Sequence, residues 1–223
     1  MKESYSIKRN ERTSKMKIKV VLLAILVLFT CSCGVKDLSK GEIENVKYEE
    51  TSEITNYVKI EMNNNDVILI ELYPNIAPIT VENFQKLVNE KYYDGLIFHR
   101  VIKDFMVQTG DPTGTGTGGS EETITGEFSA NGIENNLSHD RGIISMARKG
   151  SDPETEYTLN SASSQFFIMH ADYPYLDGNY AAFGKVIAGM SAVDNIATTA
   201  VNNNNKPIKE QKIRSIRFVT IEK

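Results

Sequence analysis

The stretch FHRVIKDFMVQTGD, residues 98–111, combines an apolar run with two polar side chains, Arg100 and Gln108. Runs rich in Phe, Val, Ile and Met are typical of strands that face a core. A buried arginine is costly unless it is paired, so its presence in such a run needs an explanation. Arg100 and Gln108 therefore either have a structural role or line a cavity in which a ligand binds.

Short strand patterns dominate the chain around this stretch. Residues 57–62 (YVKIEM) alternate apolar and polar side chains, and residues 67–74 (VILIELYP) follow after an Asn-rich turn, which predicts a hairpin. Residues 77–95 have apolar side chains at helical spacing, with Thr80 as a possible cap, and residues 190–200 predict a second helix. The remaining apolar runs are short, which favours a mainly β, closed architecture.

The N-terminal residues differ from the rest in charge and hydrophobicity. Residues 1–33 carry seven Lys or Arg and two Glu, a net of +5, which leaves −9 for the rest of a chain whose total is −4. The apolar run from Val20 to Phe29 is too short to span a membrane, which needs about 20 residues. A basic segment, a short apolar run and small residues in this order predict an export signal.

Both cysteines of the chain, Cys31 and Cys33, end this signal. The arrangement resembles a bacterial lipoprotein signal, and we expect lipidation at Cys33, with Cys31 as the alternative. An ordinary signal peptide with incidental cysteines is the competing interpretation. Residues 34–55 are polar and acidic without a sustained period, which predicts a flexible tether, and residues 56–223 would form the functional domain. The predicted location is the outer face of a bacterial cytoplasmic membrane.

Several chemistries are poorly supported by the sequence. The glycines of GTGTGG, residues 114–119, do not open a helix after a strand, so they predict a tight surface loop and not a nucleotide site. The three histidines, His99, His139 and His170, have no metal-ligand spacing, and we expect neither a metal nor a cofactor. The acidic body argues against nucleic acid as a partner.

Four motifs together resemble the cyclophilin-type peptidyl-prolyl isomerases. FHRVIKDFMVQTGD is followed by PTGTGTGG, then by GIISMAR, then by SQFFIMHADYPYLDGNYAAFGKV, in the order of that family. The resemblance extends from about Tyr57 to the C-terminus. It implies a closed eight-stranded antiparallel β-barrel capped by two α-helices. It also implies cofactor-free cis–trans isomerisation of the peptide bond before proline.

The resemblance implies a role for each matching position. Arg100 matches the catalytic arginine, which would donate a hydrogen bond to the proline nitrogen in the twisted state. The other matching positions, expected to bind substrate, are Phe105, Met106, Phe167 and Leu176 in an apolar pocket, Gln108 and Gln165 as polar groups, and Ala147, Arg148, Tyr175 and Tyr180 around the groove. Taken singly, the Phe and Met positions also suit a barrel core, and Arg100 also suits a surface ion pair.

The chain departs from the best-known family members at several positions. Tyr175 replaces a tryptophan, which puts tight cyclosporin binding in doubt, and Tyr180 replaces a histidine. Arg148 replaces an asparagine and is expected to add positive charge near the groove, while Thr109 replaces a glycine. The loop 149–163 is longer than in compact members and is expected to screen or extend the groove.

The sequence thus predicts an exported, membrane-tethered prolyl isomerase, a monomer that acts on proline-containing peptides and unfolded exported proteins. Two alternatives remain open at this point. One is a peptide-binding module or holdase in which turnover is incidental, and the other is an interaction protein that uses the barrel as a scaffold.

Overall fold

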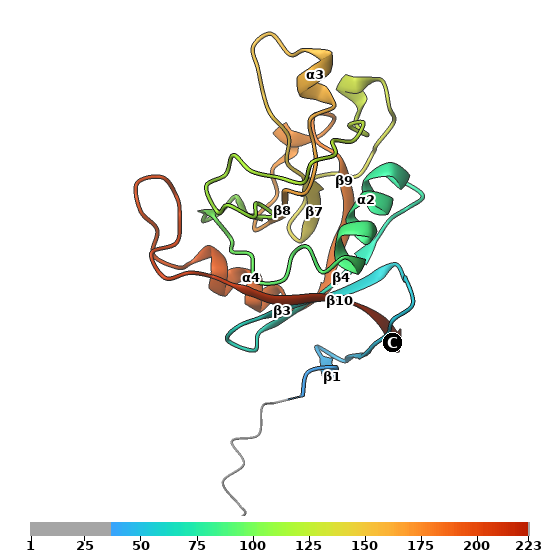
Figure 1. Ribbon diagram of the computed structural model, residues 1–223, viewed down its shortest axis with the longest axis vertical. Helices are drawn as coiled ribbons and strands as arrows, with labels where there is room; N and C mark the ends of the chain where they lie inside the picture. The colour runs from blue at the N-terminus through green and yellow to red at the C-terminus, as the bar shows by residue number, and fades with distance from the viewer. Residues whose placement is uncertain (1–36, 223) are drawn as a thin grey trace, which may run out of the picture. The chain divides into compact units, whose positions relative to one another are not determined.

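The computed structural model describes residues 37–222, which form a strongly curved antiparallel sheet with a few helices (Figure 1). The strands are β1 (Lys40–Ile43), β2 (Val46–Glu50), β3 (Tyr57–Met62), β4 (Val67–Leu72), β5 (Arg100–Ile102), β6 (Met106–Thr109), β7 (Ile143–Met146), β8 (Phe166–Met169), β9 (Ala182–Ala188) and β10 (Ile213–Glu222). Their order in the sheet is β1-β2-β10-β3-β4-β9-β7-β8-β6-β5. The expected mainly β architecture is confirmed.

The eight strands from β3 to β10 carry the family's strand number, but their ladder does not close. The two ends of this set, β5 and β10, are joined by a single isolated bridge between Ile97 and Lys212, just before each strand begins. β5 has only three residues, so little backbone is available for a continuous ladder. The predicted closed eight-stranded barrel is therefore not confirmed, and the described part of the chain forms a ten-stranded sheet with two edges.

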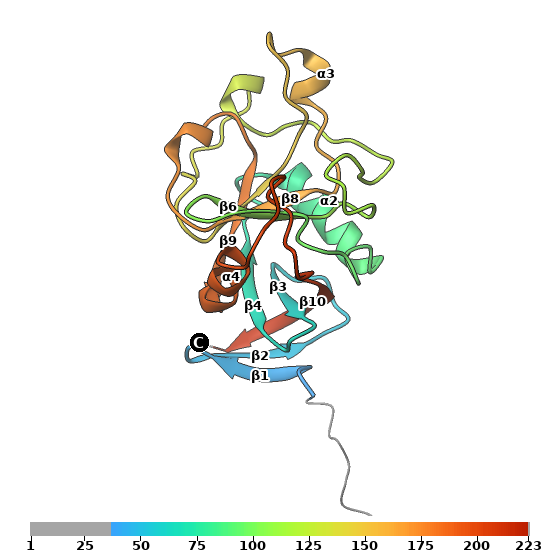
Figure 2. The same ribbon diagram turned by 90° about the vertical axis from the view of Figure 1, so that its left-hand side faces the viewer.

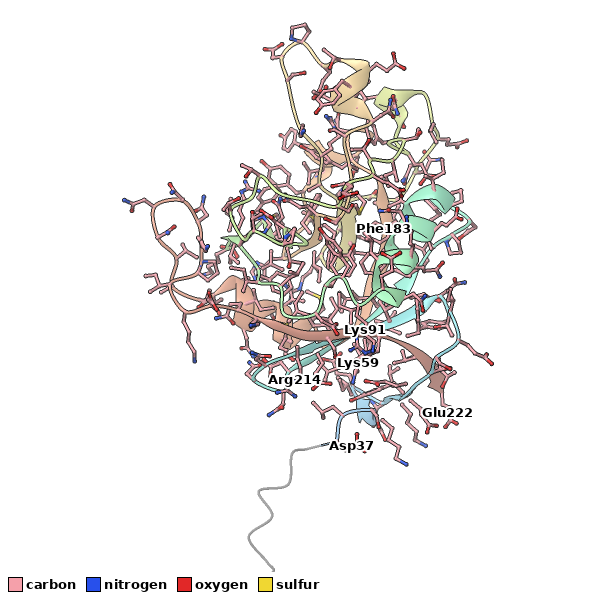
Figure 3. All side chains as sticks on the ribbon, in the orientation of Figure 1. Asp37, Lys59, Lys91, Phe183, Arg214 and Glu222 are labelled. Carbon is pink, nitrogen blue, oxygen red and sulfur yellow. The ribbon has the colours of Figure 1, made fainter. Side chains whose placement is uncertain are left out.

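Residues 40–50, expected within the flexible tether, form a β-hairpin, so the prediction of a flexible coil is wrong for them. β1 pairs with β2, and β2 pairs with the last residues of β10 (Figure 2). The hairpin covers Lys59 of β3, which is fully buried and labelled in Figure 3. The Lys59 Nζ contacts carboxylate oxygens of Glu50 at 2.5 Å and Glu61 at 3.0 Å and donates to the Leu38 carbonyl. A buried cation needs such partners, and it fixes the hairpin to the sheet.

The two predicted helices form, with different ends. Helix α2 spans Pro78–Asn89, with proline in its first turn, and α4 spans Met190–Ala197. Thr80 lies inside α2 and is not the cap, so that expectation is wrong. Instead the Glu127 carboxylate accepts hydrogen bonds from the backbone N–H groups of Ile79 and Thr80. A carboxylate from a distant loop thus satisfies the free donors of the first turn.

Three shorter helical segments lie in the loops. They are the 3₁₀ turns η1 (Ser129–Asn131) and η2 (Pro174–Leu176) and the single-turn helix α3 (Glu156–Leu159). The last two turn out to lie beside the candidate site. The helix α3 stands at the opposite end of the molecule from the β1–β2 hairpin (Figure 1).

An aromatic cluster fixes α2 against the inside of the sheet. Phe84 of α2 lies with its ring centroid 5.3 Å from each of Tyr93, Phe166 and Phe183. All four side chains are fully buried. Such contacts typically contribute about 0.5–1.5 kcal/mol per pair beyond area burial. Since Phe166 begins β8, this packing also positions the strand whose next residue, Phe167, faces the candidate site.

Within residues 37–222, no helix is both long and apolar enough to cross a membrane. The predicted signal segment 1–33, with Cys31 and Cys33, lies outside the described residues.

Candidate active site

The β5–β6 hairpin places Arg100 and Gln108 side by side. The two residues are directly opposite each other in the antiparallel register, so their side chains emerge on the same face. The Arg100 Nη1 donates a hydrogen bond of 3.2 Å to the Gln108 Oε1. Asp104, with φ of 60°, tightens the turn between the strands. The polar pair noted in the sequence therefore lies on the face of the hairpin and not in the core.

A relay of two amides connects Arg100 to the glycine-rich loop. The Gln108 Nε2 donates to the Gln165 Oε1 at 2.8 Å. The Gln165 Nε2 in turn donates to the carbonyls of Gly118 at 2.6 Å and Gly116 at 3.1 Å. Because each amide both donates and accepts, the orientation of each is fixed, and so is the acceptor that holds Arg100.

Asp111 organises the loop at the far end of this relay. Its buried carboxylate accepts from the backbone N–H groups of Thr113 at 2.7 Å, Thr115 at 3.1 Å and Gly116 at 2.6 Å. Burial alone would raise the pKa of Asp111, but the donors from Thr113, Gly118 and Gly116 hold it well below its usual range. A Cβ at Gly118 would lie 2.3 Å from the Asp111 Oδ1. The glycines thus let the loop wrap around a carboxylate.

A cavity of about 140 Å³, lined mainly by apolar residues, opens beside Arg100. Its lining contains every predicted site residue except Gln165 and Tyr175, namely Arg100, Phe105, Met106, Gln108, Ala147, Arg148, Phe167, Leu176 and Tyr180. Phe167 and Tyr180 meet edge to face, with ring centroids 5.8 Å apart. The cavity is small, apolar on one side and bordered by a guanidinium on the other, which suits one small ring attached to a polar backbone.

The guanidinium of Arg100 is half-buried and has no carboxylate partner among residues 37–222. Its close neighbours are the Gln108 oxygen, the Met106 sulfur at 3.7 Å and the Phe105 ring, whose centroid is 5.9 Å away. Burial lowers the pKa of Arg100, although an arginine stays protonated at neutral pH. A partly desolvated cation without a counter-charge gains most from a new acceptor.

The sequence model of the family described as cyclophilin-type peptidyl-prolyl cis-trans isomerase/CLD matches residues 57–218, most of the chain. The chain belongs to this family. The expected enzyme class is thereby confirmed at the level of the family.

Named relatives support this assignment. The chain is 46% identical over 147 residues to peptidyl-prolyl cis-trans isomerase ppi1 of Schizosaccharomyces pombe, covering 66% of this chain and 88% of the relative. It is 47% identical over 150 residues to peptidyl-prolyl cis-trans isomerase 10 of Caenorhabditis elegans, covering 67% and 87%. Both relatives are eukaryotic proteins, so the resemblance to bacterial lipoproteins stays a prediction.

Solved structures show the same fold. A cyclophilin-type isomerase of Cryptosporidium parvum superposes with a TM-score of 0.65 at 35% identity, covering 75% of this chain and 98% of that one. A second structure of that protein, determined in the presence of the dipeptide Ala-Pro, has a TM-score of 0.64 at 34% identity, covering 72% and 97%.

In this cyclophilin, the surroundings of the Arg148 side chain differ from those that the sequence predicted. We expected it to add positive charge near the groove, but its side chain is 95% buried and donates hydrogen bonds to Asn179, Lys149 and Glu154. Its Nη1 lies 3.0 Å from a Glu154 carboxylate oxygen, and its guanidinium lies between the rings of Phe128 and Tyr180 at 5.1 and 5.0 Å. Arg148 therefore attaches the loop 149–163 to the cavity wall.

The loop 149–163 forms part of a second, larger hollow that adjoins the cavity. This hollow has a volume of about 560 Å³ and shares Gln108, Ala147 and Arg148 with the cavity. Lys149 and Tyr157 line its outer wall, with the Lys149 Nζ donating to the Tyr157 hydroxyl at 2.7 Å. The structure thus gives the loop a position at the rim, as expected of a segment that extends the groove.

Tyr175 does not line the cavity. Its side chain is 83% exposed, and its ring contacts Tyr173, a residue that the sequence did not single out. The 3₁₀ turn η2 turns Leu176 toward the cavity and leaves Tyr175 outside it. Gln165 is likewise outside the cavity, where it acts through Gln108.

The sequence also did not predict a series of hydrogen bonds behind the cavity. Asp177 accepts from the His139 ring at 2.8 Å, and the other ring nitrogen of His139 lies 3.0 Å from the Ser145 hydroxyl. Ser145 is fully buried beneath Phe167, its direct neighbour in the sheet, so no substrate reaches it. These hydrogen bonds therefore support Phe167 in position. Nothing in the spacing of these three residues predicts their contact, because they come from separate loops and strands.

Proposed function

We propose that this site accelerates rotation of the peptide bond before proline, with Arg100 as the catalytic residue. The observation that carries the proposal is a half-buried guanidinium, free of carboxylates within the described residues, at the rim of a small cavity lined mainly by apolar residues. The cavity takes the proline ring, and the guanidinium faces the amide nitrogen.

The physical basis is selective stabilisation of the twisted amide. Resonance gives the bond double-bond character and a barrier of about 18–20 kcal/mol. In the twisted state the proline nitrogen gains a lone pair and accepts a hydrogen bond from Arg100, whereas the planar nitrogen is a poor acceptor. Bringing a step of tens of seconds to roughly 10³ per second requires about 6–7 kcal/mol. Arg100 supplies part of this and the shape of the cavity the rest.

The amide relay keeps the guanidinium in place during the rotation. Arg100 would otherwise swing toward water, because within residues 37–222 only one side-chain oxygen, the Gln108 Oε1, accepts from it. Gln165 holds that oxygen toward Arg100 from behind. Pre-organisation of this kind avoids a reorganisation cost at the moment of reaction.

Exchange NMR on a short X-Pro peptide tests the proposal. The full chain is compared with its Arg100→Ala variant, and Arg217→Ala serves as the control because Arg217 is a half-buried arginine on β10, paired with Asp94. We expect fast exchange in the parent and the control and a loss of at least about a hundredfold in Arg100→Ala, since about 3 kcal/mol of selective stabilisation is removed. Equal exchange rates in all three would overturn the assignment. Peptide binding by the parent without acceleration would favour the binding module.

We further propose that the enzyme assists the folding of exported proteins while anchored through lipid on Cys33. Support comes from the basic, apolar and small-residue pattern of residues 1–33, and Cys31 is the alternative position. Metabolic labelling tests the lipid anchor: a bacterium that expresses the full chain is grown with a labelled fatty acid, and label on the protein is measured. We expect label in the parent and in Cys31→Ala and none in Cys33→Ala. Absence of label from the parent would leave the ordinary signal peptide.

A further inference from the structure

An aromatic surface continues outward from the cavity. The guanidinium of Arg100 faces the Phe105 ring at 5.9 Å, Phe105 lies 4.6 Å from Tyr173, and Tyr173 lies 5.6 Å from Tyr175, all measured to ring centroids. Tyr173 is 39% exposed and Tyr175 is 83% exposed. We call Phe105, Tyr173 and Tyr175 the aromatic ledge.

The aromatic ledge is held rigidly by the turn that carries it. The Tyr173 N–H donates to the His139 carbonyl at 2.9 Å, and Pro174 restricts the backbone that follows. On the other side of the turn, the Asp177 carboxylate accepts from the His139 N–H at 2.7 Å. A surface that is already ordered loses little conformational entropy when a ligand binds to it.

The ledge is continuous with the peptide site because Phe105 belongs to both. Phe105 is the last residue of the turn before β6, three residues before Gln108, which corresponds to about 10 Å at 3.3 Å per residue of extended chain. On the Gln108 side, the cavity adjoins the second, larger hollow. On the Phe105 side, it adjoins the aromatic ledge. A peptide whose proline occupies the cavity therefore meets the ledge with a neighbouring residue on one side only.

We propose that the aromatic ledge binds a large apolar or aromatic side chain of the substrate peptide, next to or one residue away from the proline on the Phe105 side. This proposal rests on the isomerase function proposed above and adds a specificity determinant to it. Ring faces and edges favour an aromatic or large aliphatic partner. The exposed charged residues next to the ledge in the sequence are Lys103, Asp104 and Asp172, so the surroundings do not favour an acidic side chain.

A phenylalanine scan of a model peptide tests this proposal. Each peptide is alanine-rich and contains one proline and one Phe. The Phe is placed in turn at each of the two positions before the proline and each of the two positions after it. For each peptide, kcat/KM is measured by exchange NMR and affinity by NMR titration. We expect a gain of about threefold to tenfold over the all-alanine peptide on one side of the proline, as one aromatic contact provides.

Variants assign the gain to the ledge. The ratio between Phe and Ala peptides should fall in Tyr175→Ala and approach one in the double variant Tyr173→Ala/Tyr175→Ala. Ile54→Ala, which removes an exposed apolar side chain from another surface, should keep the ratio of the parent. Use of the ratio cancels any change in the overall rate or in the folded fraction.

The outcomes separate the two proposals. A gain on neither side, or a gain that survives the double variant, would overturn the ledge while leaving the isomerase intact. If the parent accelerates no peptide, the isomerase proposal fails. The peptide affinities then still test whether the ledge binds the Phe side chain. A preference for Phe in binding that depends on the two tyrosines supports it in either case.

Discussion

Replacing Asp111 by asparagine separates the charge of this carboxylate from its shape. In the parent, one oxygen accepts from the Thr113 N–H and hydroxyl, and the other from the N–H groups of Thr115 and Gly116. Asparagine keeps one acceptor and turns an amino group toward the remaining donors. Losing two charge-assisted hydrogen bonds at about 1.5–2 kcal/mol each lowers the free energy of unfolding by roughly 3–4 kcal/mol at pH 7. Urea unfolding measures this difference.

The same substitution has a defined pH dependence. The folded-state pKa of Asp111 lies below its unfolded value of about 3.9, so between the two the folded state binds fewer protons. The contribution of Asp111 is therefore fully present above about pH 4 and is lost as the pH falls further. The parent and Asp111→Asn should converge in stability in this acidic range. If the free energies of unfolding of the parent and Asp111→Asn differ by the same amount at pH 7 and pH 3, the charge of Asp111 does not have this role.

Activity should fall with the relay that Asp111 supports. A loosened loop removes the carbonyls that hold Gln165, and through it Gln108 and Arg100. Under conditions where it is fully folded, Asp111→Asn should lose about tenfold in kcat/KM, the equivalent of one hydrogen bond of about 1.4 kcal/mol. Gln165→Ala should show a similar loss of activity with a much smaller loss of stability. Parent-like activity in both variants would refute the relay.

Three further predictions concern other parts of the molecule. Lys59→Ala should lower the free energy of unfolding by about 3 kcal/mol in urea titrations, because Glu50 and Glu61 lose their buried partner; a change below about 1 kcal/mol would contradict this. Burial lowers the pKa of both His99 and His139, so the folded state binds fewer protons than the unfolded one below about pH 6.5. Stability should fall as the pH drops from there, less steeply in His99→Gln. Glu154→Ala should speed amide exchange in α3 while changing global stability by under about 1 kcal/mol, since Glu154 is exposed; unchanged exchange would argue against Glu154 fixing the loop.

The sequence predicts best where a motif is long or a period is regular. The alternation in YVKIEM places Val58, Ile60 and Met62 in the core, as observed. The resemblance in residues 98–111 brings Arg100 to the edge of the cavity. Both features are local, because strand alternation and a two-strand hairpin depend on neighbours within a few residues.

Contacts between distant segments could not be predicted in the same way. Lys59 is on the polar face of its strand, and only the β1–β2 hairpin buries it. Arg148 was expected to add positive charge near the groove, yet Glu154 pairs with it and two aromatic rings enclose it. The polarity of residues 40–50 gives no sign of a hairpin, because most of these residues face water. Backbone pairing with β10, the buried Tyr48 and the contact between Lys59 and Glu50 hold the hairpin in place.

The buried lysine also decides where this protein can be divided. The family match begins at residue 57, but the acceptors of Lys59 reach back to Glu50 and Leu38. A fragment cut at the family boundary would keep the cation and lose those two partners. It would also leave the last residues of β10 as an unpaired edge, a template for strand addition by another molecule. The smallest fragment that preserves this arrangement begins at Leu38, and one cut at residue 57 would be prone to self-association.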